Sequence, residues 1–368
     1  MGTAAGKGSG RATLAMVAEI ADVSLGTASK VVNGRVGVGA PTRARVEKIM
    51  AEIGYVPNGI RSDPDGSSVK GSLIEVVVDS LRNPYTSSLI GGVLDGAEPA
   101  GLGVVTRRLS AIQLKDPVRW AQSLAASGRI GVIEVTSAFS PQRYAALEQA
   151  GLPMVLIDPI DVPRADVLSV GATNWAGGMA ATEHLLALGH REIAYVGGPR
   201  GAICDQARAH GYLAAMRTAG LSVNLDDVPH GPFTFEQGLV AGTAVLSRTD
   251  RPTAIFAGSD VTATGVLEAA RVMGLRVPEQ LSVVGFDNTF LAGTSTPRLT
   301  TIHQPLSEMG RTAVRVITRV LAGDPPESRR LELATHLVVR DSTAPPAVGQ
   351  AREPRSKPNT RYAAAVGA

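Results

Sequence analysis

The sequence has one cysteine, few aromatic residues and no long apolar run. Cys204 alone cannot form an intrachain disulfide, and it excludes a metal site built from several cysteines. No apolar stretch reaches the roughly 20 residues that span a bilayer, and residues 1–11 lack the hydrophobic segment of a secretory signal. Phe, Trp and Tyr make up 4% of the chain, so aliphatic residues must form the core. We therefore expect a soluble, cytoplasmic protein of two or three domains.

Motifs of catalysis and cofactor binding are also missing. The chain contains neither GxSxG nor a phosphate-binding GxxxxGK[ST] loop, and its six histidines are scattered. The segment Gly197-Gly198-Pro199 follows a predicted strand, but it lacks GxGxxG spacing and its proline removes an amide donor. We expect no enzyme activity, no cofactor and no metal.

Charge is distributed unevenly along the chain. The net charge is +3, yet residues 1–62 carry +4, residues 344–368 carry +3 and the stretch between them carries −4. A basic end on a mildly acidic body is typical of a nucleic-acid-binding module attached to a larger domain, although a solvated pair of basic helices would look the same. Residues 1–11 and 344–368 lack periodicity and are predicted to be disordered tails.

The segment after the first tail predicts three short helices. The first has apolar residues at i, i+3, i+4 and i+7, namely Leu14, Val17, Ala18 and Ala21. Ser24 can cap a second helix that Gly34 ends, and a third runs from Pro41 to Gly54. Two short helices joined by a turn of about three to four residues describe a helix-turn-helix.

This segment resembles the DNA-binding domain of the LacI/GalR family of bacterial transcription regulators. VAEIADVSLGTASKVVNG and PTRARVEKIMAEIGYVPN carry the resemblance without gaps over about 46 residues, and it continues to about residue 343. It implies that helix 25–32 enters the major groove, with Lys30 reaching guanine and Leu25 and Gly26 at base-reading positions. The residues that it implies hold phosphates are Thr13, Ser24, Thr27, Ser29, Asn33, Thr42, Tyr55 and Asn58.

The linker at 59–71 departs from the family pattern. In the family this stretch forms a hinge helix whose exposed Leu wedges into the minor groove. Here Asp63 or Pro64 stands where that Leu belongs; the groove repels Asp, and Pro disfavours helix at the residue before it. Either Ile60 takes the wedge role, or this linker does not kink DNA.

The large domain at 72–343 alternates predicted strands with helical stretches. Such repeats predict parallel sheets covered by helices on both faces. The number of strands favours two similar lobes. The expected fold is an all-α helix-turn-helix domain (12–58) followed by a two-lobed α/β domain, periplasmic-binding-protein-like by resemblance. The predicted strands are 73–78, 103–106, 131–135, 154–157, 167–170, 193–196, 254–257 and 281–286.

Polar residues follow several of these strands. Each one alone is most often a helix N-cap, but ligands in such folds bind beyond the carboxyl ends of strands, where these residues converge. The resemblance implies that Arg208 and Asp260 hydrogen-bond ligand hydroxyls. Tyr85, Trp175 and Phe233 are candidates for packing on a sugar ring, and each could equally be core. The predicted ligand-binding residues are Tyr85, Asp158, Arg208, Phe233, Asp260 and Asp287.

The function expected from this resemblance is repression controlled by a small ligand. A homodimer would bind a pseudo-palindromic double-stranded DNA operator, and a mono- or oligosaccharide would bind between the lobes. The alternative is a sugar-binding protein whose coupling to DNA is lost or altered by the atypical hinge. A transporter's solute-binding protein would need a signal peptide and no helix-turn-helix.

Overall fold

The computed structural model describes residues 14–32, 37–53, 72–109 and 115–347. Thr13, Asn33, Tyr55 and Asn58 lie outside these ranges, as do the linker at 59–71, both ends of the chain and the predictions made for them. Within the described ranges, no helix has the length and apolar character needed to cross a membrane.

Three helices form the N-terminal unit, as predicted: α1 (Leu14–Ile20), α2 (Leu25–Val32) and α3 (Ala40–Glu52). Their small core consists of Val17, Ala21, Val31, Val46 and Ile49. Ser24 Oγ accepts a hydrogen bond from the backbone N–H of Thr27 at 3.1 Å, so the predicted N-cap of α2 is confirmed. The turn between α1 and α2 passes through Asp22, whose φ is 49°.

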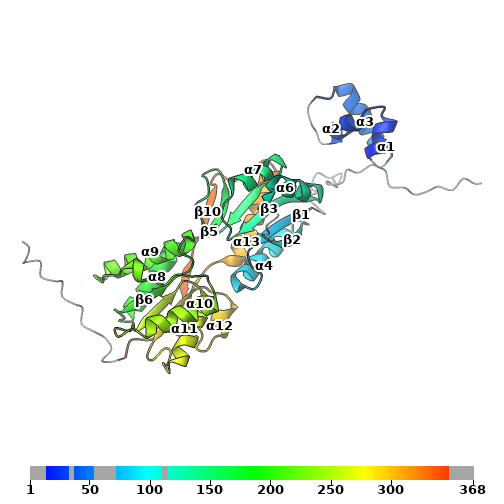
Figure 1. Cartoon of the computed structure of the whole chain (residues 1–368). Coiled ribbons are helices and arrows are strands. Elements are labelled where there is room, and N and C mark those ends of the chain that lie inside the picture. The colour runs from blue at the N-terminus through cyan, green and yellow to red at the C-terminus, as the bar shows by residue number, and fades with distance from the viewer. Residues whose placement is uncertain (1–13, 33–36, 54–71, 110–114, 348–368) are drawn as a thin grey trace, which may run out of the picture.

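The first lobe is a six-stranded parallel sheet in the order β10-β5-β4-β3-β1-β2 (Figure 1). Two apolar clusters cover its two faces, as a sheet packed between helices requires. Its elements are β1 (Leu73–Val78), α4 (Pro84–Ala97), β2 (Gly103–Arg108), α6 (Pro117–Ala126), β3 (Arg129–Val135), α7 (Pro141–Gln149), β4 (Met154–Ile157), β5 (Leu168–Ala172), α13 (Leu306–Leu321) and β10 (Arg330–Leu333).

The second lobe is a five-stranded sheet in the order β11-β9-β8-β7-β6, parallel except for its edge strand β11. Apolar clusters again lie on both faces. Its elements are α8 (Asn174–Ala187), β6 (Ile193–Val196), α9 (Ile203–Thr218), η1 (Leu225–Asp227), α10 (Phe235–Leu246), β7 (Ala254–Ala257), α11 (Asp260–Val272), β8 (Ser282–Asp287), α12 (Phe290–Thr294), β9 (Thr300–His303) and β11 (His336–Val338).

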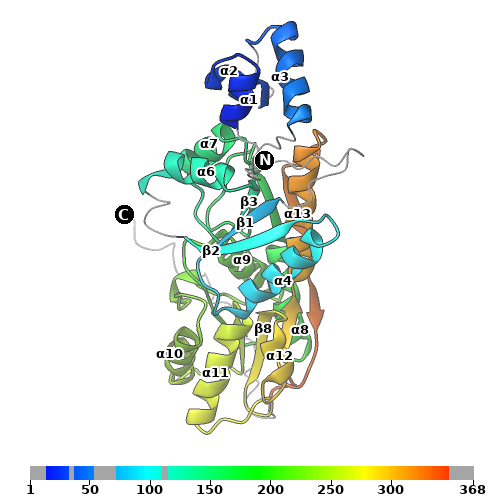
Figure 2. The same cartoon turned by 90° about the vertical axis from the view of Figure 1, so that its right-hand side faces the viewer.

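The chain crosses between the lobes three times, from β5 to α8, from β9 to α13 and from β10 to β11. Two crossings are tied together, because Thr335 N donates to Thr173 Oγ1 and Thr335 Oγ1 donates to Thr173 O, at 3.0 and 3.1 Å. Figure 2 shows the two lobes stacked one above the other, with α4 and α13 in the upper one. The expected two-lobed architecture is confirmed.

Helix α9 includes Asp205, whose Oδ1 accepts hydrogen bonds from the Tyr195 hydroxyl and the Gly198 N–H. One expectation needs correction. Residues 344–347, expected in a disordered tail, are described. Ala344 N donates to Ser282 Oγ at 3.0 Å, which fixes the chain there to the second lobe.

Candidate functional site

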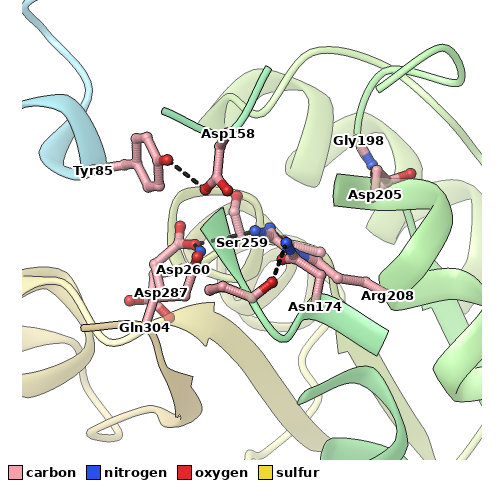
Figure 3. A network of polar contacts seen from close by, with 12 residues as sticks. Tyr85, Asp158, Asn174, Gly198, Asp205, Arg208, Ser259, Asp260, Asp287 and Gln304 are labelled. Carbon is pink, nitrogen blue, oxygen red and sulfur yellow. Dashed lines mark hydrogen bonds and ion pairs between the residues drawn. The ribbon is translucent and has the colours of Figure 1, made fainter. Parts of the chain in front are cut away.

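A cavity of about 600 Å³ lies between the lobes, beyond the carboxyl ends of their strands. This is where open parallel sheets place ligands. Five of the six predicted ligand-binding residues line it, and Figure 3 shows how the side chains of four of them, all but Phe233, lie near one another. Those five are Tyr85, Asp158, Arg208, Phe233 and Asp287.

Tyr85 and Asp158 form the first-lobe side of the cavity. Asn83 Oδ1 caps α4 by accepting from the Tyr85 N–H, which presents the ring from the first turn of that helix. The Tyr85 hydroxyl donates to Asp158 Oδ2 at 2.6 Å. Asp158 directly follows β4 with a φ of 42°. Burial raises the pKa of its carboxyl, while the Tyr85 hydrogen bond and the Arg208 charge oppose the rise.

Arg208 is the centre of the second-lobe side. Its Nε donates to Asn174 Oδ1 at 2.8 Å, and its Nη1 donates to the Gly258 carbonyl at 2.6 Å. The guanidinium lies over the buried Phe286 ring, 3.9 Å from the ring centre. No described residue accepts a hydrogen bond from Nη2, so two N–H groups remain to bind ligand oxygens.

Asp287 ends β8 and lies beside this guanidinium, with Nη1 of Arg208 3.8 Å from its Oδ1. The Asp287 backbone has a φ of 112°, which residues other than glycine rarely adopt. Gln304 Nε2 donates a hydrogen bond to Asp287 Oδ1 at 2.7 Å. Burial raises the pKa of the Asp287 carboxyl to about 8, although Arg208 lowers it. The carboxyl is therefore mostly protonated at neutral pH and can donate as well as accept a hydrogen bond.

Phe233 reaches the cavity because Gly198 has no side chain. A Cβ at Gly198 would overlap the Phe233 ring, which lies 5.6 Å from the Arg208 guanidinium carbon. Gly197 similarly leaves room for His230 and Asp205. The two glycines therefore make space for side chains of the cavity wall, which explains them without a bound phosphate.

Cys204 lines the same cavity. Burial raises the pKa of its thiol to about 12, so the thiol is protonated at neutral pH and is a weak nucleophile.

Asp260 is placed differently from the prediction. Its side chain is fully buried and does not line the cavity. Oδ2 accepts from the N–H and hydroxyl of Thr289, and Oδ1 accepts from the Thr301 hydroxyl at 2.6 Å. These bonds hold the turn after β8, so the ligand role assigned to Asp260 is corrected to a structural one. Trp175 also lies outside this cavity.

The prediction missed several cavity residues at strand ends. Asp79 and Ser80 follow β1, Thr136 follows β3 and Ser259 precedes α11. The rule that ligands bind beyond carboxyl strand ends would have included all of them. Thr136 has a φ of 47°, unusual for a β-branched residue, which only the coordinates reveal.

The candidate DNA-binding surface is the outer face of α2. Ala28 and Val31 are buried, whereas Leu25, Gly26 and Lys30 are exposed, Leu25 by 55%. A buried apolar side opposite an exposed row fits a helix that docks on another surface. Of the other predicted phosphate contacts, Ser24 is exposed, and Thr27, Ser29 and Thr42 are half-buried.

Comparison with known proteins gives consistent matches over the chain. Residues 13–58 match the profile described as bacterial regulatory proteins, lacI family, and residues 182–343 match a periplasmic binding protein-like domain. The HTH-type transcriptional regulator CelR of Thermobifida fusca is 33% identical over 339 residues, which are 90% of this chain and 98% of that protein. The repressor CytR of Escherichia coli K12 is 32% identical, over 90% of this chain and 96% of its own length.

Two solved structures extend the comparison. A complex of the transcriptional regulator CelR with cellobiose has a TM-score of 0.67 at 33% identity, covering 90% of this chain and 100% of that one. The lac repressor dimer bound to operator has a TM-score of 0.65 at 28% identity, covering 91% and 100%.

Proposed function

This chain belongs to the LacI family of bacterial regulatory proteins, and we propose that it is a repressor whose effector is a neutral sugar. The observation that carries the proposal is the interlobe cavity, whose walls include Arg208, Asp158 and Tyr85. The Arg208 guanidinium is stacked on the Phe286 ring. The same chain carries the helix-turn-helix unit. Guanidinium, carboxyl and phenol groups suit the hydroxyls of a sugar, and Phe233 suits its apolar face.

We also propose which residues of α2 contact DNA. Lys30 on the exposed face of α2 is assigned to guanine, and Leu25 and Gly26 to groove contacts. Fluorescence anisotropy on duplexes from upstream of its own gene measures operator and nonspecific binding. Lys30→Ala should weaken operator binding about 5- to 150-fold, the range for one base contact, and weaken nonspecific binding less.

Lys48→Ala is the matched control, because Lys48 is an exposed lysine of the same unit but lies on α3. It should change the affinities for both DNAs equally. Equal loss on both DNAs for Lys30→Ala would instead make Lys30 a phosphate contact.

The effector site is tested with cellobiose, the sugar in the CelR complex, by isothermal titration and by its effect on operator anisotropy. Phe233→Ala should abolish the sugar response and leave DNA binding intact, because Phe233 lies on the cavity wall. Arg208→Ala should do the same. It also leaves acceptors at Asn174 and Gly258 unpaired, so the half-buried Phe233 is the safer variant.

The direction of the anisotropy change decides between inducer and corepressor. Saturable sugar binding with no effect on DNA would favour the alternative that the linker carrying Asp63 and Pro64 has lost the coupling. The sugar should be recovered unchanged by chromatography, since we propose a binding role and no turnover. A repressor works where the DNA is, so we place it in the cytoplasm.

We propose that two chains associate through the second lobe. Val272 and Met273 at the end of α11 and Phe290 on α12 are exposed apolar residues, Phe290 by 65%. Such residues on adjacent helices are typical of an interface. A twofold dimer would present two α2 helices to a pseudo-palindromic operator.

A further inference from the structure

A second hollow of about 460 Å³ lies on another side of the cleft from the cavity described above. Its walls are β5 and β10 of the first lobe and α8 and α9 of the second, which lie next to each other in Figure 1. Asp158 and Cys204 line both spaces. A backbone hydrogen bond from Ile203 N to Ile160 O, 2.9 Å long, bridges the lobes where the two spaces adjoin.

Asp158 offers one oxygen to each side. Its Oδ2 accepts the Tyr85 hydroxyl on the side of the first cavity. Its Oδ1 points toward β5, where a Cβ at Gly171 would lie 3.2 Å from it. Asp158 lines the second hollow, and the missing side chain at Gly171 leaves room beside Oδ1, although the carboxylate also accepts from the Ala172 backbone N–H.

Trp175 gives the second hollow an aromatic wall. It is the second residue of α8, it is 48% exposed, and it lines this hollow but not the first cavity. A half-exposed indole ring beside polar groups is suited to a ligand that has an apolar face and polar edges.

The charges on the rim favour a neutral ligand. Arg330 and Glu332 are both exposed on β10, and Arg330 Nη2 donates to the Pro163 carbonyl at 2.8 Å. With Asp158, the hollow therefore presents two carboxyl groups and one guanidinium. A phosphate or carboxylate ligand would face more negative than positive charge, whereas sugar hydroxyls can bind all three groups.

We propose that this second hollow is a carbohydrate subsite, in which a sugar ring stacks on Trp175 and donates a hydroxyl to Asp158 Oδ1. The proposal rests on the sugar-binding function proposed for the first cavity. The ring is either a further unit of an oligosaccharide held in the first cavity or a separate sugar molecule, and the two sources predict different stoichiometries.

Tryptophan fluorescence can report binding in the second hollow. Its two tryptophans are Trp120 and Trp175, and Trp120 is buried in the first lobe with an indole N–H that has no described partner. Trp120→Phe therefore loses no hydrogen bond to a described residue and makes Trp175 the single tryptophan. Full-length Trp120→Phe is titrated with glucose, cellobiose, cellotriose and cellotetraose, and with the corresponding xylo- and malto-oligosaccharides, by fluorescence and calorimetry in parallel.

A subsite predicts that Trp175 emission changes at saturation. If one chain spans both spaces, affinity rises about tenfold or more at the length that reaches Trp175, with one molecule bound per chain. If a separate sugar binds, calorimetry gives two sites, and Phe233→Ala abolishes only one of them. Trp175→Ala should remove the additional affinity or the second site, and Trp175→Phe should largely keep it.

Gly171→Ala and Gly171→Val test the hollow from its other wall. Each adds volume next to Asp158 Oδ1, so affinity in the second hollow should fall in steps. Unchanged Trp175 emission, together with Trp175→Ala and Gly171→Val binding every sugar as well as the parent, overturns the subsite and leaves the first cavity standing. Absence of binding by every sugar overturns both proposals.

Discussion

Asp287→Asn should make the protein less sensitive to alkaline pH. The Asp287 carboxyl is buried, and its pKa is raised to about 8, whereas an exposed Asp in the unfolded chain has a pKa of about 3.9. The folded state therefore keeps a proton that the unfolded state has already lost between these values. Stability must fall as pH rises through this window, and above pH 8 the loss is complete because both states are ionised.

The size of the effect follows from the slope of one bound proton. One proton corresponds to about 1.4 kcal/mol per pH unit, so the Asp287 contribution should fall by about 2 kcal/mol between pH 6 and pH 8. Asn resembles the protonated carboxyl in shape, its side-chain oxygen can still accept from Gln304, and it tolerates positive φ. The variant should gain this amount relative to the parent over the same interval.

Thermal unfolding followed by circular dichroism measures the difference at each pH. A shift of about 2 kcal/mol corresponds to roughly 4–8 °C in Tm for a domain of this size. Taking the difference cancels the contributions of the histidines, which are present in both proteins. Asp166→Asn is the control, because that carboxyl lies on the surface beside Arg164 and should leave the profile from pH 6 to pH 8 unchanged. Parallel profiles for parent and Asp287→Asn would refute the reasoning.

Three further predictions follow from the other sites. Gly26→Ala should stabilise the N-terminal unit by about 0.5–1 kcal/mol in chemical denaturation, since a Cβ there meets only Ser24 Oγ at 3.8 Å. The same variant should bind the operator more weakly in fluorescence anisotropy if the helix approaches DNA closely. Asp260→Asn should cost about 1–3 kcal/mol in denaturation, because an amide cannot accept all the bonds from Thr289 and Thr301, while sugar affinity of the folded protein stays within about twofold; a selective loss of sugar binding would return Asp260 to the site. Phe290→Asp should shift the assembly toward monomer in analytical ultracentrifugation with sugar binding retained, and an unchanged dimer would remove Phe290 from the interface.

Short apolar runs in the sequence were sufficient to predict the most deeply buried strands of the two sheets. Runs such as 254–257 are buried along their whole length. The strands β9, β10 and β11 were missed, because none of them contains a long run of apolar residues. In β10 the pattern RLEL alternates exposed and half-buried residues, and β11 has three residues, so neither shows a continuous apolar signal.

The site was predictable only in part because sequence position does not reveal which way a side chain turns. Ser259 and Asp260 are adjacent and follow the same strand, yet Ser259 lines the cavity and Asp260 points into the lobe toward Thr289 and Thr301. An Asp at that place looks the more chemically apt of the two. What decides is the presence of three donors from a distant turn and β9, which come together only in the folded lobe.

The hydrogen bonds around the cavity explain how a ligand would favour one arrangement of the lobes. Tyr85 and Asp158 are bonded within the first lobe, and Arg208 is bonded within the second. Among the described residues, the bond from Ile203 N to Ile160 O is the direct hydrogen bond between the lobes at the cavity. A sugar held by both halves adds such bonds only when the lobes are close enough for both to reach it, so its affinity must differ between open and closed forms. Two or three hydrogen bonds of about 1 kcal/mol each would supply the 1–3 kcal/mol of coupling that is typical between an effector and a second site.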